Sequence, residues 1–129
     1  PLRVLLDTHA LLWWLAGDRQ LSARAKRTIS DRRHEVFVSA ASAWEVSTKH
    51  RIGKLPGAGP LAVDFAREIA LQGFTPLPIS LEHAAAAGAL VGDHRDPFDR
   101  MLIAQAREER LALVSADHAF DAFGVARIW

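Results

Sequence analysis

The chain has 129 residues, a length that suits one domain around a single buried core. Half of the residues are apolar, which excludes a disordered chain, yet no apolar run approaches the ~20 residues of a membrane-spanning helix. The absence of cysteine excludes a disulfide framework and a thiolate metal site, and the first residues lack the pattern of a secretion signal. We therefore expect one domain over residues 1–129, located in the cytoplasm.

The net charge is +1, and arginine is far more frequent than lysine among the basic residues. Lys26, Lys49 and Lys54 are the only lysines among the 16 basic side chains, so the others are arginines. The planar guanidinium of arginine binds phosphate groups well. A codon bias towards arginine explains the same excess equally well, so composition alone does not assign a nucleic-acid partner.

The first half of the chain alternates short apolar runs with helix-forming segments. We predict strands at residues 2–6 and 35–39 and helices at residues 9–16, 23–30 and 41–52. Gly17 and Gly53 follow the first and third helices as C′ glycines, and Ser22 caps the second.

The second half continues the alternation after a loop at residues 54–60, which is rich in proline and glycine. We predict helices at residues 61–72, 81–90 and 97–109 and extended segments at residues 74–79, 111–115 and 125–129. Two prolines restrict the segment at 74–79 to an edge strand or a connecting arm.

The helix at residues 97–109 has the clearest start signal in the chain. Asp96 has the form of an N-cap, and Pro97 falls at the first helical position, where its missing N–H costs nothing. Asp99 lies at the mouth of this helix, beside its apolar stripe. Taken alone, Asp99 is explained by a capping box with Asp96 and by the positive end of the helix.

The alternation of strands and helices predicts an α/β fold of three layers with a central, mostly parallel sheet. Right-handed crossovers bring the carboxyl ends of parallel strands to one edge, where ligands bind. Asp7 and Asp117 each follow a predicted strand, so both belong at that edge. Glu45 lies about one turn into the helix after the second strand, and Asp99 opens the helix that leads towards Asp117. We expect these carboxylates to converge.

A cluster of carboxylates needs a counter-ion, because like charges at close range resist joint ionisation. Converging carboxylate oxygens suit Mg²⁺ or Mn²⁺. The histidines show no zinc-binding spacing, and we expect them to be mostly surface or core residues; they are His9, His34, His50, His83, His94 and His118. For Glu45, a surface ion pair with Lys49 four residues later is the alternative explanation.

Four motifs in this order resemble the PIN-domain ribonucleases, and within them the VapC toxins of bacterial toxin–antitoxin pairs. The motifs are VLLDTH at residues 4–9, SAWE at 42–45, DPFDRMLIAQA at 96–106 and LVSAD at 113–117. Each motif is weak alone, but the four together cover nearly the whole chain. The resemblance implies a PIN-like α/β/α fold.

The resemblance also implies site residues. The acidic metal-binding and catalytic set consists of Asp7, Glu45, Asp99 and Asp117. Asp96, Thr8 and Ser115 would support these acids from outside, and Ser115 stands where the family often has threonine. Arg100 and Arg95 would hold the RNA backbone, although a helix-surface charge explains Arg100 equally well.

The activity implied by the resemblance is metal-dependent hydrolysis of RNA, with Mg²⁺ or Mn²⁺ as cofactor and a 5′-phosphate left on the product. A VapB-type antitoxin and a homodimer are the implied partners, and no membrane is involved. The alternative from another class is a non-catalytic protein-binding module that has kept the fold. Clustered acids argue against this alternative, because they would only destabilise a structural protein.

Two other enzyme or signalling classes fit the sequence poorly. A phosphotransfer receiver domain needs a functional lysine after its last core strand, and the chain has no lysine beyond Lys54. A phosphatase of the haloacid-dehalogenase type needs an aspartate two residues after Asp7, where His9 stands.

Overall fold

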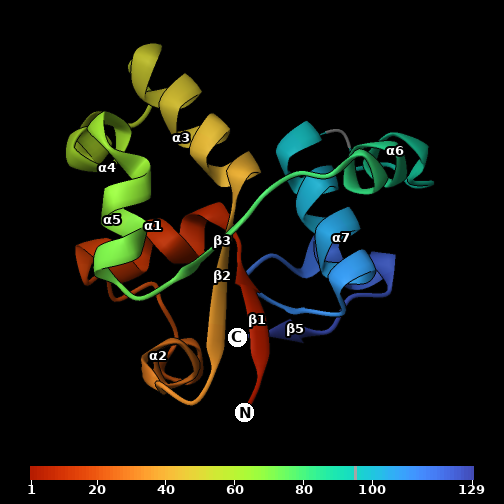
Figure 1. Cartoon of the computed structure of the whole chain (residues 1–129), viewed down its shortest axis with the longest axis horizontal. Helices are drawn as coiled ribbons and strands as arrows, with labels where there is room; N and C mark the ends of the chain where they lie inside the picture. Colours follow the sequence, from red (N-terminus) through yellow and green to blue (C-terminus); the bar gives the residue numbers. More distant parts are fainter. Residues whose placement is uncertain (95) are drawn as a thin grey trace.

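The computed structural model describes residues 1–94 and 96–129 (Figure 1). Its centre is a five-stranded sheet made of β1 (Arg3–Leu6), β2 (Glu35–Ser39), β3 (Thr75–Leu77), β4 (Ala112–Val114) and β5 (Arg127–Ile128). The strand order is β3-β2-β1-β4-β5, and every neighbouring pair is parallel. The predicted parallel sheet is therefore confirmed; β2 has its predicted bounds, and the other strands are shorter than predicted.

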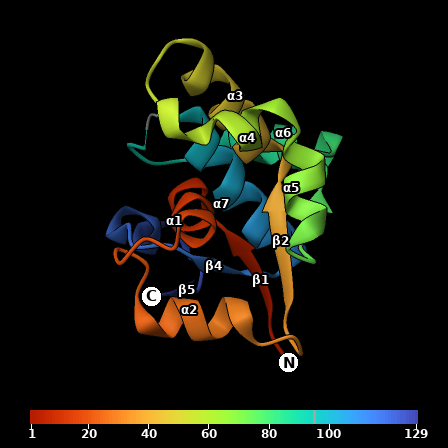
Figure 2. The same cartoon turned by 90° about the vertical axis from the view of Figure 1, so that its left-hand side faces the viewer.

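Helices lie on both faces of this sheet (Figures 1 and 2). They are α1 (Thr8–Ala16), α2 (Ala23–Ser30), α3 (Ala40–Arg51), α4 (Gly59–Val63), α5 (Phe65–Leu71), α6 (Leu81–Ala89) and α7 (Pro97–Glu109), with 3₁₀ turns η1 (Pro56–Ala58) and η2 (His118–Phe123). Helices α1, α2 and α5 cover one face, and α7 covers the other. In the part of the chain that the structure describes, no helix has the length and apolarity to cross a bilayer.

Strand β1 shows how the sequence divides the core between the two layers. Val4 and Leu6 point to the face that carries α1 and α2, whereas Leu5 packs against α7 on the other face. All three side chains are fully buried. Because side chains alternate along a strand, a continuous apolar run is needed where both faces are covered. The run at the start of the chain is thus explained by its central place in the sheet.

The predicted helix at residues 61–72 is wrong in one respect, because the chain breaks at Asp64. Asp64 has an extended φ of −147°, and its side chain accepts a hydrogen bond from the backbone N–H of Arg67. Aspartate competes with the helical backbone in this way and favours a cap over a helix interior. The segment therefore forms two helices, α4 and α5, and the predicted loop before it contains η1 and the start of α4.

The order of the strands places the carboxyl ends of β1 and β4 side by side. The backbone N–H of Asp7 donates to the carbonyl of Val114 at 3.1 Å, which joins the two strand ends. After β1 the chain continues to β2 on one side, whereas β4 and β5 lie on the other. A reversal of strand order of this kind opens a crevice at the carboxyl edge of a parallel sheet.

Candidate metal centre

Asp7 lies at the end of β1 and caps α1. Its Oδ1 accepts a hydrogen bond from the backbone N–H of Ala10 at 2.7 Å, and only 6% of the residue is exposed. Burial raises the pKa of Asp7, although the Ser115 hydroxyl and the Ala10 amide act in the opposite direction. The carboxylate is thus fixed by the fold in a place that disfavours its charge.

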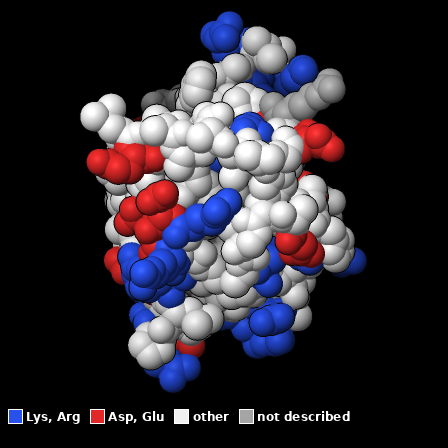
Figure 3. All heavy atoms as spheres, turned by 90° about the vertical axis from the view of Figure 1, so that its right-hand side faces the viewer, with Lys and Arg blue, Asp and Glu red and all other residues white. Residues whose placement is uncertain are grey.

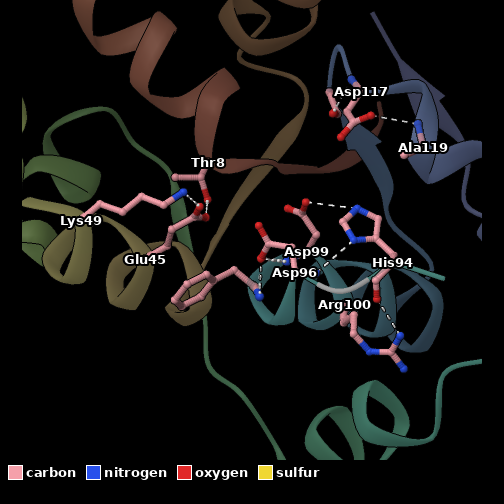
Figure 4. A network of polar contacts seen from close by, with 11 residues as sticks. Thr8, Glu45, Lys49, His94, Asp96, Asp99, Arg100, Asp117 and Ala119 are labelled. Atoms are coloured by element: carbon pink, nitrogen blue, oxygen red, sulfur yellow. Dashed lines mark hydrogen bonds and ion pairs between the residues drawn. The ribbon is translucent and has the colours of Figure 1, made fainter. Parts of the chain in front are cut away.

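Asp99 is the third residue of α7, in the first turn of the helix. The predicted N-cap is confirmed, because Asp96 Oδ1 accepts the backbone N–H of Phe98 at 2.9 Å and that of Asp99 at 3.3 Å. The Asp99 carboxylate does not complete a capping box; its Oδ2 lies 3.3 Å from Nε2 of His94 (Figure 4). The helix start therefore aims this carboxylate at the centre instead of at its own backbone.

The pKa of Asp99 reflects the negative charges of the acids around it. Burial, and after it the negative charges of Asp96, Glu45, Asp7 and Asp117, raise the pKa of Asp99 to about 7. Four other acids, from four separate parts of the sequence, thus act on this one carboxylate. Among the described residues, Asp99 and Asp117 have ligand atoms within 4.8 Å of each other, whereas Asp7 and Glu45 lie outside that group and act on Asp99 through their charge.

Asp117 reaches the centre from the turn after β4. Its backbone N–H donates to the Ser115 hydroxyl at 3.0 Å, and one carboxylate oxygen accepts from the Ala119 N–H at 2.9 Å. Ser115 is fully buried at the end of the sheet. The hydroxyl of Ser115 thus sets the course of the backbone that carries Asp117.

Glu45 is the most enclosed of the acids, with 3% of the residue exposed. The Thr8 hydroxyl donates to Glu45 Oε1 at 2.6 Å, and a further hydroxyl, from Ser42, lies 3.0 Å from that of Thr8. Glu45 Oε2 accepts a hydrogen bond from Nζ of Lys49. Both oxygens of Glu45 are therefore already held by donors of the protein.

The pair between Lys49 and Glu45 is present at the predicted spacing, but it is not an ordinary surface pair. Burial lowers the pKa of Lys49, and the carboxylate of Glu45 together with the charges of Asp96 and Asp99 outweighs this effect, so the net shift is upward. Lys49 thus faces the acidic centre as a cation. No part in the site is predicted for Lys49 from the sequence, where it is only a surface partner of Glu45.

His94 is a second residue that the sequence analysis missed. Nitrogen or oxygen atoms of His94, Asp99 and Asp117 lie within 4.8 Å of one another, a spacing at which side chains could share a metal ion. The ring lies against Phe120, with centroids 6.0 Å apart. No spacing motif marks His94, because it enters the site from the segment before α7 and packs on a residue 26 positions later.

The two arginines predicted to bind RNA have different outcomes. The Arg100 guanidinium donates to backbone carbonyls of Ala87 at 3.3 Å, of His94 at 3.0 Å and of Leu90. Figure 4 shows this group directed away from Asp99. Its donors therefore hold the end of α6 and the following segment, which favours a structural role, and the RNA contact stays a prediction. Arg95 lies outside the residues that the structure describes.

The donor chemistry of the centre fits a hard divalent cation. Asp7, Asp99 and Asp117 present carboxylate oxygens, the type of ligand that Mg²⁺ and Mn²⁺ prefer. The imidazole of His94 accepts the Asp96 N–H on Nδ1 at 3.4 Å, so in the neutral ring the proton is on Nε2, the atom nearest Asp99. In this arrangement His94 is a donor to a carboxylate and not a nitrogen ligand.

Comparison with known proteins identifies the class to which this fold and centre belong. The sequence model of the PIN domain matches residues 4–126. The chain belongs to the PIN-domain family. The α/β/α fold inferred from the resemblance is thereby confirmed.

Two curated relatives give the chain its place within that family. The ribonuclease VapC22 of Mycobacterium tuberculosis is 32% identical over 118 residues, which cover 88% of the chain and 86% of VapC22. The ribonuclease VapC16 of the same organism is 37% identical over 71 residues, 55% of the chain and about half (49%) of VapC16. The predicted kinship with the VapC ribonucleases is confirmed.

A solved structure shows the same architecture. A toxin–antitoxin complex from Klebsiella pneumoniae superposes with a TM-score of 0.69, covering 98% of this chain and 96% of that one. Its sequence identity is 22%, so the likeness concerns the fold.

Proposed function

We propose that the chain is a Mg²⁺- or Mn²⁺-dependent endoribonuclease of the VapC type, in which residues 1–129 form one nuclease domain. The observation that supports this proposal is that Asp99 and Asp117 lie together at the carboxyl edge of the sheet, where strand order reverses, and that the charge of Asp7 acts on Asp99. Clustered carboxylates destabilise a protein unless a cation neutralises them, which argues for a metal-binding role.

Asp7, Asp99 and Asp117 would hold the metal directly, and Glu45 would act on it through water, because both oxygens of Glu45 are already hydrogen-bonded. When bound, the metal contacts the scissile phosphate and lowers the pKa of a water molecule. Hydrolysis would add a water molecule to phosphorus and break the bond to the 3′ oxygen, which would leave a 5′-phosphate and a 3′-hydroxyl. Thr8 and Lys49 hold Glu45 in place, and Ser115 fixes the backbone of Asp117.

The proposal includes a protein partner that controls the activity. A nuclease of this kind is harmful to its own cell when uncontrolled, and the related complex from Klebsiella pneumoniae is a toxin with its antitoxin. We therefore infer a cognate VapB-type antitoxin and a homodimeric toxin. The cytoplasm, where RNA is abundant, is the location that this role requires.

Cleavage of total cellular RNA by the purified, antitoxin-free chain tests the proposal. The reaction is run with Mg²⁺, with Mn²⁺ and with EDTA, and the Asp99→Asn protein controls for contaminating nucleases. We expect metal-dependent cleavage that the variant lacks, with product ends that carry a 5′-phosphate. A folded protein that binds neither Mn²⁺ nor Mg²⁺ and cleaves no RNA would instead be a binding module.

A further inference from the structure

An aromatic pair lies beside the acidic centre and has no part in the proposed hydrolysis. The rings of Trp44 and Phe98 meet edge to face, with centroids 5.0 Å apart and planes at 79°. Trp44 is on α3 and is 63% exposed, and Phe98 is on the first turn of α7. The other three tryptophans of the chain are at least half-buried, so Trp44 is an exception.

The position of this pair is fixed by the same helices that carry the acids. Trp44 directly precedes Glu45, and Phe98 directly precedes Asp99. On α3, the side chains of Ser42, Glu45 and Val46 are buried, which sets the rotation of the helix and leaves Trp44 facing outward. The two rings therefore lie at the rim of the centre, on the two helices that supply Glu45 and Asp99.

Electrostatics alone does not explain how RNA would be retained at this rim. The acids repel phosphate groups, and the net charge of the chain is only +1. The guanidinium of Arg100 is hydrogen-bonded to backbone carbonyls. On the face seen in Figure 3, acidic and basic side chains are interspersed. Base stacking on aromatic rings is attractive without any charge on the protein. In an edge-to-face pair, the ring that presents its edge keeps both faces free of its partner.

We propose that Trp44 and Phe98 form a stacking site for an unpaired base of the RNA, next to the phosphate that is cleaved. The inference rests on the proposed nuclease function, and it adds that the RNA is unpaired at the nucleotide bound by these rings. A base that stacks on these rings has left its own duplex stack, so the RNA is single-stranded at this nucleotide. Stacking tolerates any base, and sequence choice must then depend on other contacts.

The test measures RNA binding separately from cleavage. Anisotropy of a short, fluorescently labelled single-stranded RNA is recorded with the Asp99→Asn protein and with Trp44→Leu or Phe98→Leu added to it. We expect each added change to weaken binding by about tenfold or more, and Trp44→Phe to recover most of the loss. An RNA of the same length without bases should bind all these variants equally.

Tryptophan fluorescence tests the contact directly, because a purely structural role of Trp44 predicts no change in its emission when RNA binds. RNA should quench the emission of the parent protein, and Trp44→Phe should abolish most of that change. Leu81→Ala is the matched control, because Leu81 is also an exposed apolar residue (87%) but lies on α6. Circular dichroism and melting temperature confirm that each variant is folded.

Unchanged RNA affinity in both leucine variants would overturn the stacking site. Loss of a co-purifying protein partner with unchanged RNA affinity would do the same and would assign the rings to a protein contact. If the wild-type chain cleaves no RNA while the ring variants still lose RNA binding, the stacking site stands and the nuclease proposal fails.

Discussion

The imidazole Nε2 of His94 lies 3.3 Å from Oδ2 of Asp99, and Nδ1 of the same ring accepts the Asp96 N–H. One ring thus joins the cap of α7 to the carboxylate in its first turn. The ring also stacks on that of Phe120. Donors that orient a metal-binding carboxylate commonly affect metal affinity as strongly as the ligands themselves.

Replacing His94 by alanine should therefore weaken the metal site without unfolding the protein. We expect Mn²⁺ affinity, measured by calorimetry, and RNA cleavage to fall by about 10- to 100-fold. His50→Ala is the control, because His50 is an imidazole on α3 that makes no hydrogen bond to the acids among the residues that the structure describes. Equal metal affinity in both variants would mean that His94 does not position Asp99.

The raised pKa of Asp99 makes stability depend on pH in a stated direction. Its pKa is about 7 in the folded chain and 3.8 ordinarily, so between these values the folded state binds the extra proton. Stability in EDTA should fall as pH rises from about 4 to 7 and then level off, with an Asp99 contribution of about 1–2 kcal/mol after screening by solvent. Asp7 acts in the same direction, because its pKa is also raised.

Thermal melts from pH 4 to 8 in EDTA test this direction, with Asp99→Asn as the comparison. The variant should lose most of the pH dependence in the interval from about 4 to 7. Saturating Mn²⁺ should reverse the trend, because a metal binds the ionised carboxylate. A wild-type stability that rises with pH in EDTA would contradict the raised pKa.

Removing one charge from the centre should stabilise the metal-free protein. Asp7→Asn keeps an oxygen for the Ala10 N–H at the start of α1, so the cap is retained while the charge is lost. We expect melting temperatures of Asp7→Asn and Asp99→Asn to rise by a few degrees in EDTA, and metal-induced stabilisation to disappear. Asp121→Asn is the control, because that surface carboxylate is paired with Arg127 and its loss should not stabilise the protein.

The acids could be predicted from the sequence because their positions follow from topology. Asp7 comes directly after β1 and Asp117 is the third residue after β4, and parallel strands share one carboxyl edge. Asp96 was recognisable as a cap from its Pro97 neighbour, and the structure confirms it. The cap depends on local sequence alone. The shared edge depends on the right-handed crossovers that parallel sheets have in common.

The partners of the acids could not be predicted in the same way. His94 reaches Asp99 only because the segment before α7 folds back onto Phe120 of η2, a tertiary contact with no sequence period. The pair of Lys49 with Glu45 could be predicted from their spacing. The charges of Asp96 and Asp99 reach Lys49 only because of how α3 approaches α7. Likewise, the break at Asp64 depends on whether one aspartate caps or continues a helix, a choice that packing decides.

Arg100 offers a test that separates structural support from RNA binding. Its guanidinium donates to carbonyls at the end of α6 and of His94, so Arg100→Gln should destabilise the protein by about 1–3 kcal/mol. Urea unfolding measures this loss. At a temperature where the variant is folded, its affinity for single-stranded RNA should match that of the Asp99→Asn parent in which it is made. A selective loss of RNA affinity with unchanged stability would restore the phosphate contact expected from the sequence.

Lys49 places a cation against Glu45, Asp96 and Asp99 in the metal-free centre. Replacing Lys49 by glutamine leaves the buried Glu45 carboxylate without its charged partner, while Thr8 still donates to the other oxygen. Stability in EDTA should therefore fall by about 1–3 kcal/mol. Mn²⁺ should then stabilise the variant more than it stabilises the wild type, because the metal no longer shares the acids with an ammonium group. Lys54→Gln, which removes a lysine from the loop after α3, controls for the change in net charge. If Lys49→Gln and Lys54→Gln have equal stability in EDTA and gain equally from Mn²⁺, Lys49 has no role in neutralising the centre.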